Sequence, residues 1–140
     1  MSEGSKGAHT LRGLPGRGEK VLIVEDDENL RTALARMLKN LGFSVLTAVD
    51  GEDAIDVIEH TGETIDVLLT DVVMPRLDGP GLVDRLRECG IRPPVVYMSG
   101  YENGSAVTSR PVDEGVPLLH KPFTPNAVVF VLREVLDHHP

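Results

Sequence analysis

The stretch VLLTDVVMPRLDG, residues 67 to 79, places a carboxylate inside a run of apolar residues. Apolar side chains precede Asp71 at positions 67–69 and follow it at positions 72–74. A short apolar run of this kind is typical of a buried strand. An unpaired charge is costly to bury, so Asp71 needs a partner that compensates its charge. The identity of that partner should indicate the function.

Strand-length apolar runs alternate with helix-period patterns outward from this stretch in both directions. The predicted strands are residues 21–24, 44–48, 65–70, 95–98 and 117–119. The predicted helices cover about residues 30–41, 51–59, 81–88 and 125–136, with Gly42, Asp50 and Thr124 as capping residues. Asp78 and Gly79 are expected only to turn a loop. Between the fourth and fifth strands, Gly104, Pro111 and Gly115 interrupt the pattern, which predicts a short or irregular fourth helix.

Five nearly continuous apolar strands separated by helices predict a parallel sheet covered on both faces, because parallel strands need crossover connections. The expected fold class is therefore a doubly wound, flavodoxin-like α/β fold. Residues 1–19 contain five glycines and no apolar periodicity, so they are interpreted as a flexible leader or linker. Residues 20–138 form the predicted domain.

The composition of the chain argues against several classes of function. The chain has 140 residues, of which 41% are hydrophobic, and this suits a single domain with one core. A net charge of −8 and the lack of a long Lys/Arg run argue against direct binding of nucleic acid. A single cysteine and the absence of a long apolar segment predict a cytoplasmic protein with no membrane anchor.

Polar side chains collect where the predicted strands end. The first strand is followed by Glu25, Asp26 and Asp27, the third by Asp71, the fourth by Ser99, and the fifth by His120 and Lys121. Ligands of an open parallel sheet bind beyond these carboxyl ends. Converging carboxylates would repel one another unless a cation lies among them, and Mg²⁺ prefers oxygen ligands shared with a phosphate. Neither a GxxxxGK[ST] nor a GxGxxG motif occurs, so Asp71 itself is the candidate phosphoryl acceptor.

Four segments together resemble the receiver domain of two-component response regulators. They are VLIVEDDENLR, LLTDVVMPRLDG, VVYMSG and LHKPFTP, and each follows or contains the end of the appropriate strand. The resemblance covers the chain from about residue 20 to residue 137. It implies a phosphorylation-dependent signalling switch rather than an enzyme.

The resemblance also implies roles for individual residues. Asp71 matches the phosphoacceptor and a metal ligand, Asp26 a direct ligand of Mg²⁺ (or Mn²⁺ in its place), and Glu25 an acid that acts through water. The backbone carbonyl of Val73 matches a further ligand, whereas its side chain does not coordinate. Asp27 falls outside the acidic pair and is better interpreted as a residue of a helix start.

Two more matches complete the implied site. Ser99 matches the hydroxyl that hydrogen-bonds the phosphoryl group, and Lys121 matches the lysine that neutralises its charge. The bond from Lys121 to Pro122 is cis in the family. Leu118 stands where many receivers have an aromatic residue, and His120 is interpreted as a solvated or packed side chain rather than a catalytic one.

The partners that the resemblance implies are a histidine kinase or a histidine phosphotransfer protein and an unidentified downstream protein. The segment LLHKPFTPNAVV favours a receiver of the hybrid sensor kinase type, and a monomer or weak dimer is expected. Two alternatives stay open. One is a receiver that binds partners without phosphorylation. The other is a Mg²⁺-dependent phosphatase, which usually has a second aspartate at the position that Val73 occupies.

Overall fold

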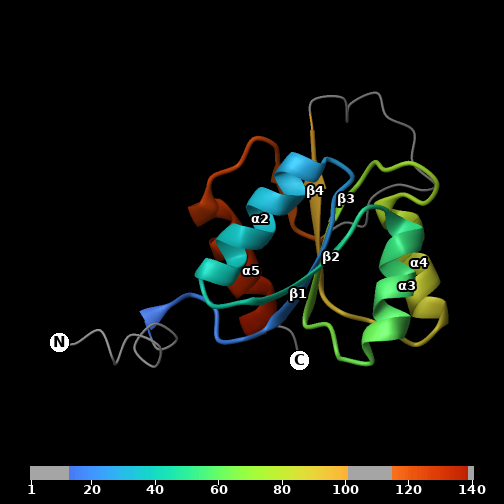
Figure 1. The fold of residues 1–140 in the computed structure, drawn as a ribbon, viewed down its shortest axis with the longest axis horizontal. Coiled ribbons are helices and arrows are strands. Elements are labelled where there is room, and N and C mark those ends of the chain that lie inside the picture. The colour runs from blue at the N-terminus through green and yellow to red at the C-terminus, as the bar shows by residue number, and fades with distance from the viewer. Residues whose placement is uncertain (1–12, 101–114, 139–140) are drawn as a thin grey trace.

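The computed structural model describes residues 13–100 and 115–138, and within them the strands form one parallel sheet. The strands are β1 (Lys20–Val24), β2 (Ser44–Ala48), β3 (Val67–Asp71), β4 (Val95–Ser99) and β5 (Leu118–His120). Their order is β2-β1-β3-β4-β5, so β3 is the central strand. The predicted doubly wound α/β fold is confirmed (Figure 1). The predicted irregular fourth helix falls mostly on residues 101–114, outside the described residues.

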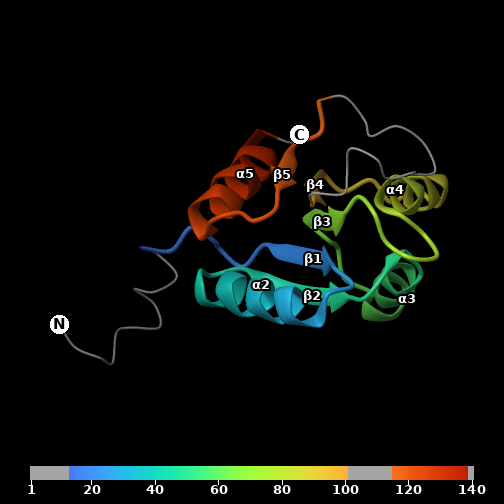
Figure 2. The same cartoon turned by 90° about the horizontal axis from the view of Figure 1, so that it is seen from above.

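Helices cover both faces of the sheet. Helices α2 (Glu28–Asn40) and α5 (Pro125–His138) lie on one face, and α3 (Gly51–Thr61) and α4 (Gly79–Glu88) lie on the other (Figures 1 and 2). Successive residues of each strand point to opposite faces. Val21 and Ile23 of β1 accordingly join the core under α2 and α5, whereas Leu22 and Val24 join the core under α3 and α4. In the part of the chain that the structure describes, no helix is long and apolar enough to cross a membrane.

The predicted capping residues fix where the helices begin. The Asp50 side chain accepts a hydrogen bond from the Asp53 N–H at 2.8 Å, and the Thr124 hydroxyl accepts one from the Ala127 N–H at 3.1 Å. Asp27 caps α2, as the helix-start interpretation expected. These contacts satisfy backbone donors that no helical carbonyl can reach.

Two of the differences from the predicted boundaries concern the elements on either side of Asp71. Strand β3 begins at Val67 rather than at residue 65, and it includes Asp71 as its last residue. Helix α4 begins at Gly79 rather than at Gly81, because the Asp78 side chain accepts a hydrogen bond from the Gly81 N–H at 2.8 Å. The expectation that Asp78 and Gly79 only turn a loop was therefore wrong. They start the helix that covers the sheet beside β3.

Gly79 lies against the backbone of the central strand. A Cβ atom at this position would be 2.4 Å from the Asp71 carbonyl oxygen and 3.1 Å from the Tyr97 ring. Both groups belong to buried strands and have little room to move. The close approach of α4 to β3 therefore requires glycine.

We expect Gly79→Ala to lower the free energy of unfolding by about 2 kcal/mol, because overpacking a tight contact typically costs about 1 to 3 kcal/mol. Denaturant unfolding with parallel measurement of Gly13→Ala checks this. A Cβ atom at Gly13 would meet nothing within 4 Å, so this control should change little. Equal losses in the two variants would contradict the close contact at Gly79.

Part of the predicted leader contacts the domain. The N–H groups of Gly16 and Gly18 donate hydrogen bonds to the carbonyl oxygens of Leu41 and Gly42 at 2.8 and 2.7 Å. Arg133 of α5 donates to the Pro15 carbonyl and also pairs with Glu19 at 2.6 Å. Residues 13–19 thus pack on the turn after α2 and on α5. The domain boundary near residue 20 stays a prediction.

Candidate functional site

Three carboxylates meet at the carboxyl ends of β1 and β3. Glu25 and Asp26 directly follow β1, and Asp71 is the last residue of β3. One side-chain oxygen from each lies within 4.8 Å of the others. Glu25 is 1% exposed and Asp71 is 3% exposed, whereas Asp26 is open to solvent. Two of the three acids are therefore withdrawn from water.

Lys121 supplies a positive charge to this cluster. It follows β5, and its Nζ lies 2.7 Å from Asp71 Oδ1 and 2.8 Å from Glu25 Oε1. The peptide bond between Lys121 and Pro122 is cis, as the resemblance implied. The structure thus brings together four of the predicted site residues: Glu25, Asp26, Asp71 and Lys121.

Glu25 is held in place by backbone and side-chain donors. Its Oε2 accepts a hydrogen bond from the Asp27 N–H at 2.9 Å, and its carbonyl oxygen accepts one from Arg31 Nη1 at 2.9 Å. Arg31 had no assigned role in the sequence analysis. Arg31 lies near the start of α2, shortly after the end of β1. This position in the sequence would have indicated that its side chain can reach the Glu25 carbonyl.

The cluster contains three acids and one lysine, and the pKa values of two of the acids are raised. Burial, and then the neighbouring Glu25, raise the pKa of Asp71 to about 8, although Lys121 acts in the opposite direction. Burial opposes ionisation of Glu25 as well, but hydrogen bonds with Asp71, Lys121 and the Asp27 N–H hold its pKa below the usual value. Burial and Glu25 raise the pKa of Asp26. One lysine does not neutralise three acids.

This donor set fits a divalent cation. Mg²⁺ binds carboxylate oxygens and usually retains several waters, and Asp26 leaves the cluster open to solvent on one side. A cation among the three acids would offset the repulsion that raises the pKa of Asp71. The residues present are therefore suited to Mg²⁺, as the sequence analysis expected.

Ser99 ends β4 next to the cluster and interacts with β5. It is 2% exposed, and its Oγ lies 3.2 Å from Nδ1 of His120. The two residues are direct partners in the β4–β5 register. His120 was interpreted as a solvated or packed side chain, and its contact with Ser99 depends on the pairing of two strands that are distant in the sequence.

The loop after β3 carries Val73, which was predicted to offer its backbone carbonyl. The Val73 side chain is half-buried and packs against the core under α3 and α4. Arg76, in the same loop, has a positive φ of 69° and forms an ion pair with the nearly buried Asp50. This pair ties the loop after β3 to the start of α3. The role of the Val73 carbonyl stays a prediction.

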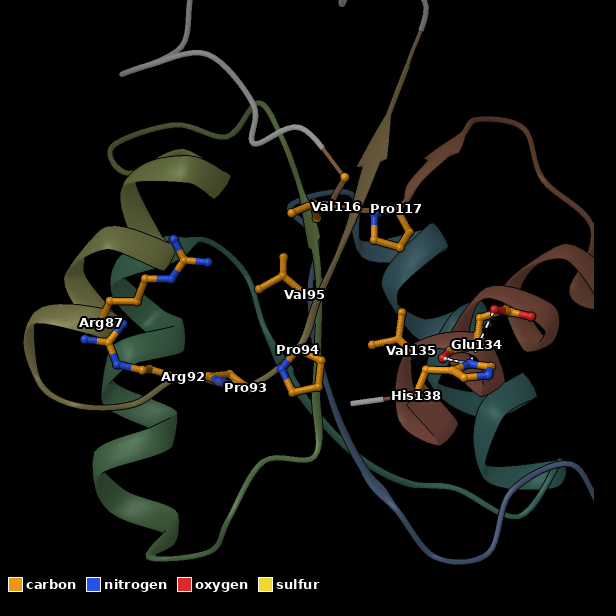
Figure 3. Close-up of a pocket in the computed structure, with 11 residues that line it drawn as sticks. Arg87, Arg92, Pro93, Pro94, Val95, Val116, Pro117, Glu134, Val135 and His138 are labelled. Atoms are coloured by element: carbon orange, nitrogen blue, oxygen red, sulfur yellow. Dashed lines mark hydrogen bonds and ion pairs between the residues drawn. The ribbon is translucent and has the colours of Figure 1, made fainter. Parts of the chain in front are cut away.

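A separate pocket of about 590 Å³ lies at the opposite ends of the strands (Figure 3). Its walls come from the end of α4, the start of β4 with the residues before it, residues 115–117 before β5, and the last turns of α5. On α5, Nδ1 of His138 lies 3.0 Å from the Glu134 carbonyl oxygen and 3.5 Å from its Oε1. None of the clustered acids lines this pocket, so it is distinct from the candidate site.

Comparison of the chain with models of known protein families identifies its family. The family model described as the response regulator receiver domain matches residues 21–133, which include every residue of the strand-end cluster. The chain belongs to this family. Receiver domains are phosphoacceptor signalling domains of two-component systems, so the recognition and the class of function predicted from the sequence are confirmed at this level.

Individual relatives extend this receiver assignment. The chain is 32% identical over 117 residues to the sensor kinase CckA of Brucella abortus, a match that spans 84% of this chain and 12% of the kinase. It is 29% identical to the uncharacterized transcriptional regulatory protein YbdJ of Bacillus subtilis, over 88% of this chain and 53% of that protein. The chain thus spans about half or less of these relatives.

Solved structures agree with the fold. The receiver domain from the hybrid histidine kinase CckA superposes with a TM-score of 0.69 and 36% identity, covering 84% of this chain and 98% of that chain. The chemotaxis protein CheY4 of Vibrio cholerae superposes with a TM-score of 0.69 and 25% identity, covering 85% and 99%. The sheet and its flanking helices are therefore those of a receiver domain.

Proposed function

We propose that this receiver domain accepts a phosphoryl group on Asp71 from a histidine kinase or a histidine phosphotransfer protein. The observation that carries the proposal is the contact of the nearly buried Asp71 with Lys121 at 2.7 Å, inside a cluster with Glu25 and Asp26. Three acids seldom lie this close together for structural reasons alone, because each raises the cost of ionising the others.

The chain's own residues have distinct parts in the transfer. An Asp71 oxygen attacks the phosphorus atom of a phosphohistidine, and a new P–O bond forms as the P–N bond breaks. The electron pair returns to the donor imidazole, which takes up a proton. Lys121 holds the Asp71 carboxylate and neutralises charge on the incoming group. Ser99, at the end of the adjacent strand, donates a hydrogen bond to a phosphoryl oxygen.

Glu25, Asp26, Asp71 and the Val73 carbonyl would hold Mg²⁺, or Mn²⁺ in its place. The ion would supply positive charge to the transferring phosphoryl group. Asp26 is the exposed acid of the cluster and is suited to direct coordination, whereas the buried Glu25 already accepts hydrogen bonds from Lys121 and the Asp27 N–H. These contacts support the division between a direct ligand and an acid that acts through water.

The phosphorylated state would be read through the ends of β4 and β5. Ser99 and Lys121 stand at these ends, and their movement toward the phosphoryl group would reshape the surface that they support. A downstream partner that prefers this shape would shift the equilibrium between the two states. The similarity to the receiver domain of the hybrid kinase CckA supports the hybrid-kinase subtype.

A hollow beside the site suits the approach of a donor protein. It measures about 340 Å³ and is lined by Leu30, Lys121, Pro122 and Phe123. Leu30 belongs to α2 and the other three to the segment between β5 and α5. A donor helix that packs here would bury apolar side chains within reach of Lys121, next to Asp71.

Phosphotransfer from a set of radiolabelled histidine kinases tests the function. We expect at least one kinase to label the wild-type domain within minutes, and we expect loss of label in Asp71→Asn and after removal of Mg²⁺ by a chelator. Asp27→Asn is the matched control, because asparagine also caps helices and this residue lies outside the proposed acidic pair. Equal labelling of Asp71→Asn and wild type would contradict the assignment.

A further inference from the structure

The hydroxyl of Ser99 already has a partner in the unphosphorylated domain. Ser99 Oγ lies 3.2 Å from Nδ1 of His120, and the two residues face each other across the parallel pair β4 and β5. Ser99 is buried, whereas His120 reaches the surface. The contact therefore links a buried residue at the end of β4 to an exposed residue of β5, which is an edge strand of the sheet.

A serine hydroxyl carries a single proton to donate. A neutral imidazole with its proton on Nε2 offers Nδ1 as an acceptor, and with His120 in this tautomer the Ser99 hydroxyl donates to Nδ1. The same proton is needed when the hydroxyl turns to a phosphoryl oxygen. His120 and a phosphoryl group on Asp71 thus compete for one donor.

We propose that His120, with its ring proton on Nε2, is a positioning residue, which accepts the hydrogen bond of the Ser99 hydroxyl in the unphosphorylated state and releases it on phosphorylation. This inference rests on the proposed function, because it assigns a regulatory partner to a residue of that same site. Leu118, two residues earlier on the same face of β5, is 39% exposed and has no polar atom with which to hold the hydroxyl. Among the described residues, the side-chain contact from β5 to the Ser99 hydroxyl therefore comes from His120.

The side-chain geometry supplies a matched pair of substitutions. Asparagine at position 120 places an oxygen acceptor close to the position of the histidine Nδ1, whereas valine has no acceptor and suits a strand. His120→Asn should keep the contact with Ser99, and His120→Val should remove it. Ser99→Ala removes the donor, so His120→Val in that background should have no further effect if His120 acts through Ser99.

The test is the affinity for beryllium fluoride, which mimics a phosphoryl group on a carboxylate, measured by calorimetry with saturating Mg²⁺. We expect His120→Val to bind it about fivefold more tightly than wild type, because the resting state loses a hydrogen bond that is worth about 1 kcal/mol. His120→Asn should retain the wild-type affinity. Ser99→Ala and the double variant Ser99→Ala/His120→Val should bind equally.

A second measurement reports the contact itself. In the metal-free protein, the nitrogen NMR shift of His120 Nδ1 should change in Ser99→Ala.

Several results of these measurements would contradict the inference. An unchanged or weaker affinity of His120→Val would overturn the inference, and so would tighter binding by His120→Val in both backgrounds. An Asn variant that behaves like the Val variant would show that the acceptor atom is irrelevant. Failure of the wild-type domain to bind beryllium fluoride would instead overturn the proposed function itself, together with this inference.

Discussion

Asp71→Asn is expected to stabilise the metal-free domain at pH 8 by about 2 to 4 kcal/mol. Burial and Glu25 raise the pKa of Asp71 to about 8, while the same carboxyl in the unfolded chain has a pKa near 3.8. Between these values the folded state retains a proton that the unfolded state has released. Stability of the wild type therefore falls as the pH rises from about 4 to about 8, and asparagine removes this loss.

Denaturant unfolding in chelator at several pH values measures the difference between variant and wild type. The difference should be small near pH 4 and should grow up to about pH 8. Saturating Mg²⁺ should shrink it, because the ion stabilises the wild-type carboxylate and the variant lacks that ligand. Asp56→Asn, at an exposed position of α3, is the control and should change little. A pH-independent difference would contradict the raised pKa.

Lys121→Met is expected to have the opposite sign and to cost about 3 kcal/mol in chelator at pH 8, because removing one partner of a buried ion pair leaves the other uncompensated. Here the lysine contacts both Asp71 and Glu25, at 2.7 and 2.8 Å. Methionine preserves the apolar stem of the side chain but removes the charge. Mg²⁺ should restore part of the lost stability by supplying positive charge to the same acids.

Lys39→Met serves as the control for this variant. Lys39 lies exposed in the last turn of α2, where a surface charge is worth little. Urea unfolding of both variants, with and without Mg²⁺, gives the comparison. If Lys121→Met were no less stable than Lys39→Met, the lysine would not be the partner that compensates the buried carboxylates.

The sequence predicted the convergence of the site because parallel strands end at the same edge of a sheet. Apolar runs located the strand ends, and the residues that follow them, such as Glu25 and Lys121, were placed correctly relative to Asp71. The capping residues Asp50 and Thr124 were also predictable, since a cap is decided by neighbours within three positions.

What the sequence did not indicate depends on contacts between distant segments. The requirement for Gly79 arises from the approach of α4 to the backbone of β3. The pairing of Ser99 with His120 follows from the β4–β5 register, which a single sequence does not reveal. Residues 13–19 have no apolar periodicity, and their contacts with the turn after α2 come from backbone groups whose pairing leaves no pattern in the sequence.

Chemical trapping of an acyl phosphate tests most directly whether Asp71 itself accepts the phosphoryl group. Incubation with Mg²⁺ and a small acyl phosphate donor, followed by borohydride trapping and peptide mapping by mass spectrometry, locates the modified residue directly. We predict a single modified residue, Asp71, and an unmodified Asp71→Asn variant. Modification at any other residue, or undiminished modification of the variant, would contradict the assignment of Asp71 as the phosphoacceptor.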